Sequence, residues 1–124
     1  MIDFKNASFI KLRPVSEREF ASMVTPIFVQ GESIIQSYKG IRDGVVFTNK
    51  RIITINVQGL TGTKKDFTSL PYNKIQAFSV ETAGILDLDS ELDLWFSGMG
   101  RVRLEFVASA NVAEICRVIS AFTL

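Results

Sequence analysis

The stretch ETAGILDLDSELDLWFSG, Glu81 to Gly98, alternates aliphatic and acidic residues over most of its length. One parity carries Leu86, Leu88, Leu92, Leu94 and Phe96, and the other carries Asp87, Asp89, Glu91, Asp93 and Trp95. A period of two is typical of a β-strand that buries one face. We therefore expect the leucines to point into a core and the acids to face solvent, with Ser90 marking a bend or bulge on the apolar side.

The same acids suggest a calcium loop as an alternative. A loop of the EF-hand type needs glycine at its sixth position and a bidentate acid at its twelfth. Counted from Asp87, these positions hold Leu92 and Gly98, so both requirements fail. A glycosidase-like pair of carboxylates is a weaker alternative, because acids along one exposed strand face indicate no cleft. The strand explains the spacing without a metal, and we expect no metal site and no cofactor.

The composition argues against most catalytic and secreted classes. The chain of 124 residues is 47% hydrophobic and contains no histidine, the commonest general base and metal ligand. Cys116 is the only cysteine, so neither an internal disulfide nor a thiolate metal site is expected. No apolar run has the length of a signal peptide or a membrane span. We expect one domain, 1–124, in a cytoplasmic protein that is neither an enzyme nor an integral membrane protein.

Further strands are expected on both sides of the opening stretch, near 33–41, 45–49, 51–57, 66–72, 74–81 and 101–107. Asp43-Gly44 predicts a tight hairpin turn between the first two of them. A short helix over about 16–24 begins with a capping box of Ser16 and Glu19, and Asn111 caps an amphipathic helix at the end of the chain. Seven antiparallel strands and one such helix predict a partly open barrel with the helix closing one end.

The charges divide into two regions of opposite sign. Residues 39–74 carry seven basic and two acidic residues, and residues 75–100 carry five acidic residues and no basic one. Both regions have the composition of ordinary solvated faces, but complementary charge on one small domain also fits self-association. We predict a cyclic homo-oligomer in which Asp87, Asp89, Glu91 and Asp93 of one subunit lie near the basic strands of the next.

Six basic residues lie at or beside three successive predicted turns: Lys39, Arg42, Lys50, Arg51, Lys64 and Lys65. Loops at one end of a barrel can form an anion-binding mouth through charge-assisted hydrogen bonds. The alternative function is therefore binding of a phosphate-bearing headgroup or an acidic peptide, with Lys50 and Arg51 as the first candidates. Nucleic acid is not expected, because the net charge is only +1 and the aromatic residues mostly follow core parity.

Two segments resemble the bacterial pleckstrin-homology (PH) domain family. FTNKRIITI contains Thr48-Asn49-Lys50-Arg51, which is similar to the family's second turn, and SVETAGILDLDSELDLWFSG is similar to its most characteristic segment. Pro71-Tyr72 and Ile75 also fit, and the resemblance covers about residues 31–123.

The resemblance implies a PH-like fold of two near-orthogonal antiparallel sheets with seven strands, closed at one end by a C-terminal helix. It also implies a small stand-alone protein with a tendency to form ring-shaped homo-oligomers. Eukaryotic relatives often bind phosphoinositides through basic residues in the first hairpin. This chain departs from them, since its first turn, IRDG, is tight and lacks the usual basic positions.

Overall fold

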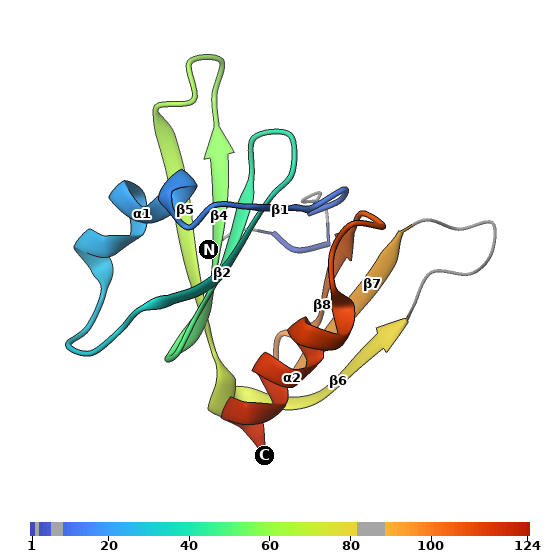
Figure 1. Cartoon of the computed structure of the whole chain (residues 1–124). Helices are drawn as coiled ribbons and strands as arrows, with labels where there is room; N and C mark the ends of the chain where they lie inside the picture. The colour runs from blue at the N-terminus through green and yellow to red at the C-terminus, as the bar shows by residue number, and fades with distance from the viewer. Residues whose placement is uncertain (2, 6–8, 82–88) are drawn as a thin grey trace.

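The structure, a computed structural model, describes residues 1, 3–5, 9–81 and 89–124. Its elements are β1 (Arg13–Val15), α1 (Arg18–Val24), the 3₁₀ turn η1 (Thr25–Ile27), β2 (Ile34–Lys39), β3 (Gly44–Thr48), β4 (Arg51–Gln58), β5 (Lys64–Pro71), the 3₁₀ turn η2 (Tyr72–Lys74), β6 (Ile75–Glu81), β7 (Ser90–Phe96), β8 (Gly100–Phe106) and α2 (Val112–Thr123). A large antiparallel sheet has the order β1-β2-β3-β4-β5, and a small one has the order β6-β7-β8 (Figure 1). The PH-like fold expected from the sequence is confirmed, with the three-residue strand β1 added to the seven predicted strands.

The chain before α1 connects the two sheets, which the sequence did not predict. Phe9–Leu12 lies along β8: the Glu105 N–H donates to the Phe9 carbonyl (2.9 Å) and the Leu12 N–H donates to the Glu105 carbonyl (3.0 Å). The next residue, Arg13, begins β1, which pairs with β2, so one short segment contacts both sheets. The barrel-like core therefore begins well before residue 31.

The main core lies between the two sheets and α2. The apolar side of the opening stretch is confirmed for its described part, since Leu92, Leu94 and Phe96 are buried, while Asp87 and Leu88 lie outside the described residues. Ser90 pairs in regular register with Phe106, so the expected bulge is not formed there. Helix α2 packs its buried residues Ile115 and Ile119 into this core. Its predicted cap is confirmed: the Glu114 N–H donates to Asn111 Oδ1 (3.1 Å).

A second apolar cluster lies on the other face of the large sheet. Phe20 and Val24 of α1 pack there against the buried residues Val46, Ile53 and Ile55. The predicted capping box of α1 is wrong. The Ser16 hydroxyl accepts from the Arg18 N–H (3.2 Å), and the Glu19 carboxylate binds Lys39 Nζ (2.6 Å) instead of turning back to the helix start.

Gly44 serves packing and does not form the predicted turn. The turn consists of residues 40–43, closed by the Gly40 N–H donating to the Asp43 carbonyl (2.8 Å), and Gly44 is already paired with Lys39. A Cβ on Gly44 would lie 2.6 and 2.8 Å from ring carbons Cε2 and Cε1 of the buried Phe20. Glycine here allows α1 to approach the sheet.

Replacing Gly44 by alanine should therefore lower the free energy of unfolding by about 1–3 kcal/mol, the usual cost of overpacking. Urea denaturation measures the change. In a Phe20→Leu background, which removes the clashing ring carbons, the same substitution should cost clearly less, because the two positions are coupled. Equal costs in both backgrounds would show that Phe20 is not the reason for glycine.

Candidate functional site

Arg51, one of the two first candidates for anion binding, is committed to an internal ion pair. Its Nε and one terminal nitrogen bind the two carboxylate oxygens of Glu32 at 3.0 and 2.9 Å, and the guanidinium also donates to the Ile27 carbonyl (2.6 Å) and the Ser69 hydroxyl (3.0 Å). The Glu32 side chain is 0% exposed and also accepts from the Thr48 hydroxyl (2.7 Å). This group joins the loop before β2 to the β3–β4 turn.

The environment of Glu32 favours its charged form. Burial raises the pKa of the Glu32 carboxyl, but hydrogen bonds from Arg51, Thr48 and the Val29 N–H outweigh it, so that the pKa lies below its ordinary value. An incoming anion would have to displace this carboxylate from Arg51. Arg51 is therefore a structural residue in the geometry observed.

Lys39 and Arg42 also have internal partners. Lys39 Nζ binds Glu19, and this hydrogen bond and its charge lower the pKa of the Glu19 carboxyl. Arg42 donates to the carbonyls of Gly59 (2.7 Å) and Val57 (2.8 Å). Because Arg42 lies in the β2–β3 loop and its acceptors lie at the end of β4, it fastens the β2–β3 and β4–β5 loops together.

The six predicted basic residues do not form one site. Lys64 lies opposite Gln58, whereas Arg51 and its neighbour Lys50 lie at the other end of β4, about 20 Å away for a strand of this length. The structure therefore separates Lys50 and Arg51 from Lys39, Arg42, Lys64 and Lys65. At the Lys50 end, Tyr72 stacks on Phe122 of α2 (5.0 Å between ring centroids), and the exposed Lys50 lines a shallow hollow with these two rings.

The end of the molecule away from α2 carries the fastened loops, which both point the same way in Figure 1. Two aliphatic side chains lie in them: Ile41 is 87% exposed, and Leu60 is fully exposed. We call Ile41, Leu60, Lys64 and Lys65 the loop-tip surface. These two aliphatic residues were not among the predicted site residues, although apolar residues beside the glycines of turns are a detectable signal.

The acidic strand is only partly solvent-facing. Asp93 lies on the outer face of the small sheet, but it is only 8% exposed because Arg103 covers it, binding the two carboxylate oxygens at 2.8 and 3.0 Å. The expectation of an exposed Asp93 was wrong for this reason. The hydrogen bond from Arg103 lowers the pKa of the Asp93 carboxyl, despite opposing desolvation. Asp89 is half-buried just before β7, and Asp87 lies outside the described residues.

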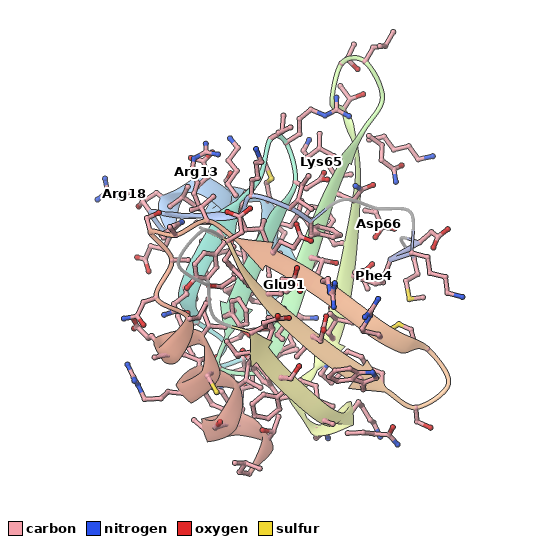
Figure 2. The ribbon with its side chains drawn as sticks, turned by 90° about the vertical axis from the view of Figure 1, so that its right-hand side faces the viewer. Phe4, Arg13, Arg18, Lys65, Asp66 and Glu91 are labelled. Carbon is pink, nitrogen blue, oxygen red and sulfur yellow. The ribbon has the colours of Figure 1, made fainter. Side chains whose placement is uncertain are left out.

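Register places three carboxylates in a line across the small sheet. Glu91 of β7 lies opposite Glu81 of β6 on one side and Glu105 of β8 on the other. We call these residues the glutamate row; Figure 2 labels its central member. Like charges directly opposite one another are unfavourable, and Arg103, 3.4 Å from Glu91, provides only partial compensation. The sequence could not reveal the row, because Glu81 and Glu105 join it only through strand pairing.

The described residues show no group of three or more histidine, cysteine or acidic side chains placed to hold a metal. Within the same residues, no helix is long and apolar enough to cross a membrane. Strands β5 and β6 each end a sheet, and no described strand pairs along their outer edges.

Comparison with known proteins agrees with the observed architecture. Residues 3–123 match the family model of the bacterial PH domain. YjqA of Bacillus subtilis strain 168 is 41% identical over 118 residues, which cover 94% of this chain and 90% of that protein. The structure of a DUF1696 family protein with a pleckstrin-homology domain from Shewanella loihica PV-4 is 40% identical, covers 93% of this chain and 99% of that one, and has a TM-score of 0.82. A PH domain from Shewanella amazonensis SB2B is 39% identical with a TM-score of 0.70, covering 96% and 93%. The chain therefore belongs to the bacterial PH domain family.

Proposed function

We propose that this protein is a non-enzymatic assembly module that forms a cyclic homo-oligomer through head-to-tail contacts. The glutamate row is the observation that supports it best. Three carboxylates in register destabilise the isolated sheet, and a cationic surface placed against them would relieve the repulsion. A second copy of the chain offers such a surface in Lys64 and Lys65, which have no ion pair among the described residues.

The open edges support the same function. Outer backbone groups of β6 lack strand partners within the described part of the chain, and pairing between subunits would satisfy them. Trp95, partly exposed on the same outer face of β7 as Glu91 but four residues farther along the strand, offers apolar area for such a contact. Charge then sets orientation, whereas burial of apolar surface provides most of the affinity. Two different complementary surfaces on one subunit make a heterologous contact, which closes into a ring when the rotation allows.

Sedimentation velocity at tens of micromolar tests this proposal. We expect the wild type to sediment as an oligomer, and the double variant Glu81→Lys, Glu91→Lys to shift towards monomer without unfolding. The control Glu17→Lys, Glu114→Lys makes the same change in net charge at exposed positions, just before α1 and within α2, and should leave assembly intact. A monomeric wild type would refute the assembly function.

A mixing experiment tests the charge pairing itself. The variant Lys64→Glu, Lys65→Glu should also assemble poorly alone, because its two surfaces are both acidic. Mixed with the Glu81→Lys, Glu91→Lys variant, it should form hetero-oligomers, since each subunit then offers the charge that the other lacks. Absence of mixed species would reject the pairing of these surfaces.

The loop-tip surface favours a second candidate function, binding of an anionic ligand such as a phosphate-bearing headgroup. Exposed aliphatic side chains beside lysines that have no ion pair within the described part of the chain suit the interface of an anionic bilayer, where apolar groups insert and cations attract the headgroups. Arg42 supports this function indirectly by holding both loops at the same end.

Cosedimentation with vesicles of phosphatidylcholine and phosphatidylglycerol tests the second function. We expect binding by the wild type and loss of binding in Lys64→Glu, Lys65→Glu. The control Lys50→Glu, Arg117→Glu changes the charge equally at the α2 end and should bind normally. A glutamate-rich peptide in place of the vesicles tests the acidic-peptide form of the ligand. Equal behaviour of both variants, or no binding by the wild type to either probe, would reject this site.

A further inference from the structure

A small apolar slot opens between the two sheets where β5 faces the β7–β8 turn. Its walls are mainly the apolar residues Leu70 and Pro71 of β5, Phe96 of β7 and Met99, and Ser69, Ser97 and the exposed Lys74 also line it. The slot has a volume of about 270 Å³, which lies below the range of about 300–1,000 Å³ usual for pockets that hold a drug-sized ligand. Its size and apolar walls suit a single side chain better than a cofactor.

The slot lies directly beside an open backbone edge. Strand β5 has eight residues and ends the large sheet, and no described strand pairs with its outer side. In an antiparallel pair, every second residue points its N–H and C=O away from its partner, so alternate residues of β5 present hydrogen-bonding groups that no described strand uses. A residue added opposite Leu70 would point to the same face as Leu70, which is the face of the slot.

The charge at the rim restricts the occupant further. Lys74 is exposed and forms no ion pair with a described residue, so an acidic side chain next to the slot would gain a partner. The chain's own Met1 already lines the slot from one side, and its amino group lies 3.7 Å from the Asp66 carboxylate of β5. Met1 remains mostly exposed, so its side chain lies beside the slot without filling it. Its position shows that an apolar side chain can lie there.

We propose that the outer edge of β5 binds an extended peptide, which adds a strand to the large sheet and inserts one apolar side chain between Leu70, Phe96 and Met99. Main-chain hydrogen bonds provide the affinity in this mode of recognition, and the slot provides the specificity. An acidic residue of the peptide pairs with Lys74. This inference is independent of the assembly proposed above.

The available edge favours a peptide over a second folded copy. Pro71 has no N–H and ends the hydrogen-bonding edge, and the eight-residue strand that it ends offers only a short stretch for pairing. A contact of this length buries far less than the about 800 Å² per partner of a standard stable interface. A short peptide does not need that area, because its main chain hydrogen-bonds along the edge of an existing sheet.

Selection of random heptapeptides displayed on phage against the immobilised protein tests the proposal. We expect enrichment of peptides that carry one aliphatic or methionine side chain with an acidic residue nearby. The selected peptides, made synthetically, should lose at least about tenfold in affinity when alternate backbone amides are N-methylated, because those amides donate to β5. Methylation of the other amides should have little effect. If N-methylation were tolerated equally at all amides, the peptide would not be bound as an added strand.

Two variants and a control locate the site. Met99→Lys places a charge in the slot and should abolish binding of the selected peptides. Lys74→Glu should select basic residues in place of acidic ones. Arg117→Glu makes the same change on the exposed surface of α2, away from β5, and should select the wild-type sequences. Circular dichroism checks that each variant is folded.

Three outcomes would contradict the peptide site. They are unchanged binding to Met99→Lys, no enrichment at all, and peptides that bind only by dissociating an oligomer, which would give this edge to a second copy. Binding that persists in a monomeric charge-reversed variant would support the peptide site even if the assembly function failed.

Discussion

Replacing Glu32 by alanine is expected to lower the free energy of unfolding by about 3–5 kcal/mol, the usual result of removing one partner of a buried ion pair. The loss leaves the Arg51 guanidinium largely buried without its counter-charge, and removes the acceptor of the Thr48 hydroxyl and the Val29 N–H. These groups join three chain segments, so the loop before β2 should also loosen. Urea denaturation followed by tryptophan fluorescence measures the stability, and hydrogen exchange measures the loop.

Glu19 provides the matched control. It forms an ion pair with Lys39 that has a shorter N–O distance than the pair of Glu32 with Arg51, 2.6 against 2.9 Å, but both side chains are partly exposed to solvent. Surface pairs contribute little because water screens them. Glu19→Ala should therefore leave the denaturation midpoint almost unchanged. If Glu19→Ala and Glu32→Ala cost the same, burial would not be what gives the Glu32 pair its importance.

The pH dependence gives a second check on Glu32. The pKa of its carboxyl is lower in the folded protein than the ordinary value of 4.5, so the ionised form contributes stability above that value. This contribution is lost as the pH falls through the folded pKa, because the folded carboxylate must then bind a proton. The stability difference between the wild type and Glu32→Gln should therefore shrink as the pH is lowered below about 4.5. A constant difference down to acid unfolding would contradict the pKa shift.

The parts of the fold that the sequence predicts are those with a local signature. The period of two in β7 and the stripe and cap of α2 are visible in consecutive residues, because each element repeats its own pattern. Phe9–Leu12 has no such pattern. Its place beside β8 comes from hydrogen bonds to residues more than ninety positions away, and only the tertiary structure supplies those partners.

Gly44 and Arg51 show how local signals can mislead. Asp43-Gly44 is a common dipeptide of hairpin turns, but glycine is needed at position 44 because the Phe20 ring of α1 packs against it. Turn preferences depend on neighbouring residues and do not include this contact from a distant helix. Arg51 has the sequence context of an exposed turn cation, but Glu32, nineteen residues earlier, binds it. For the candidate site, charge counts predict that two surfaces of opposite sign exist. They cannot predict which charged side chains already form ion pairs within the subunit. Arg51, Lys39 and Asp93 do so, and they are therefore not available as free surface charges.

Leu94→Ala is expected to lower the free energy of unfolding by about 2–5 kcal/mol, the range for a buried leucine that leaves a cavity. Leu94 lies in the central strand of the small sheet, between Phe78 of β6 and Val102 of β8, and it is 0% exposed. Neighbours on both sides are held by strand pairing, so the core cannot collapse fully into the space. The loss should therefore exceed that of a leucine at a sheet edge. Differential scanning calorimetry and urea denaturation both measure it.

The control for Leu94 lies three residues earlier in the same strand. Glu91→Gln changes an outward-facing side chain of opposite parity and removes the central charge of the glutamate row. Its cost should be near zero or slightly negative, because relief of repulsion from Glu81 and Glu105 offsets the weak contact with Arg103. The two substitutions thus separate the two faces of β7: one loses core packing, and the other loses a charge that the folded monomer does not need. If Glu91→Gln destabilised the monomer as much as Leu94→Ala, the row would have a structural role within the subunit, and its availability to a second copy would lose its basis.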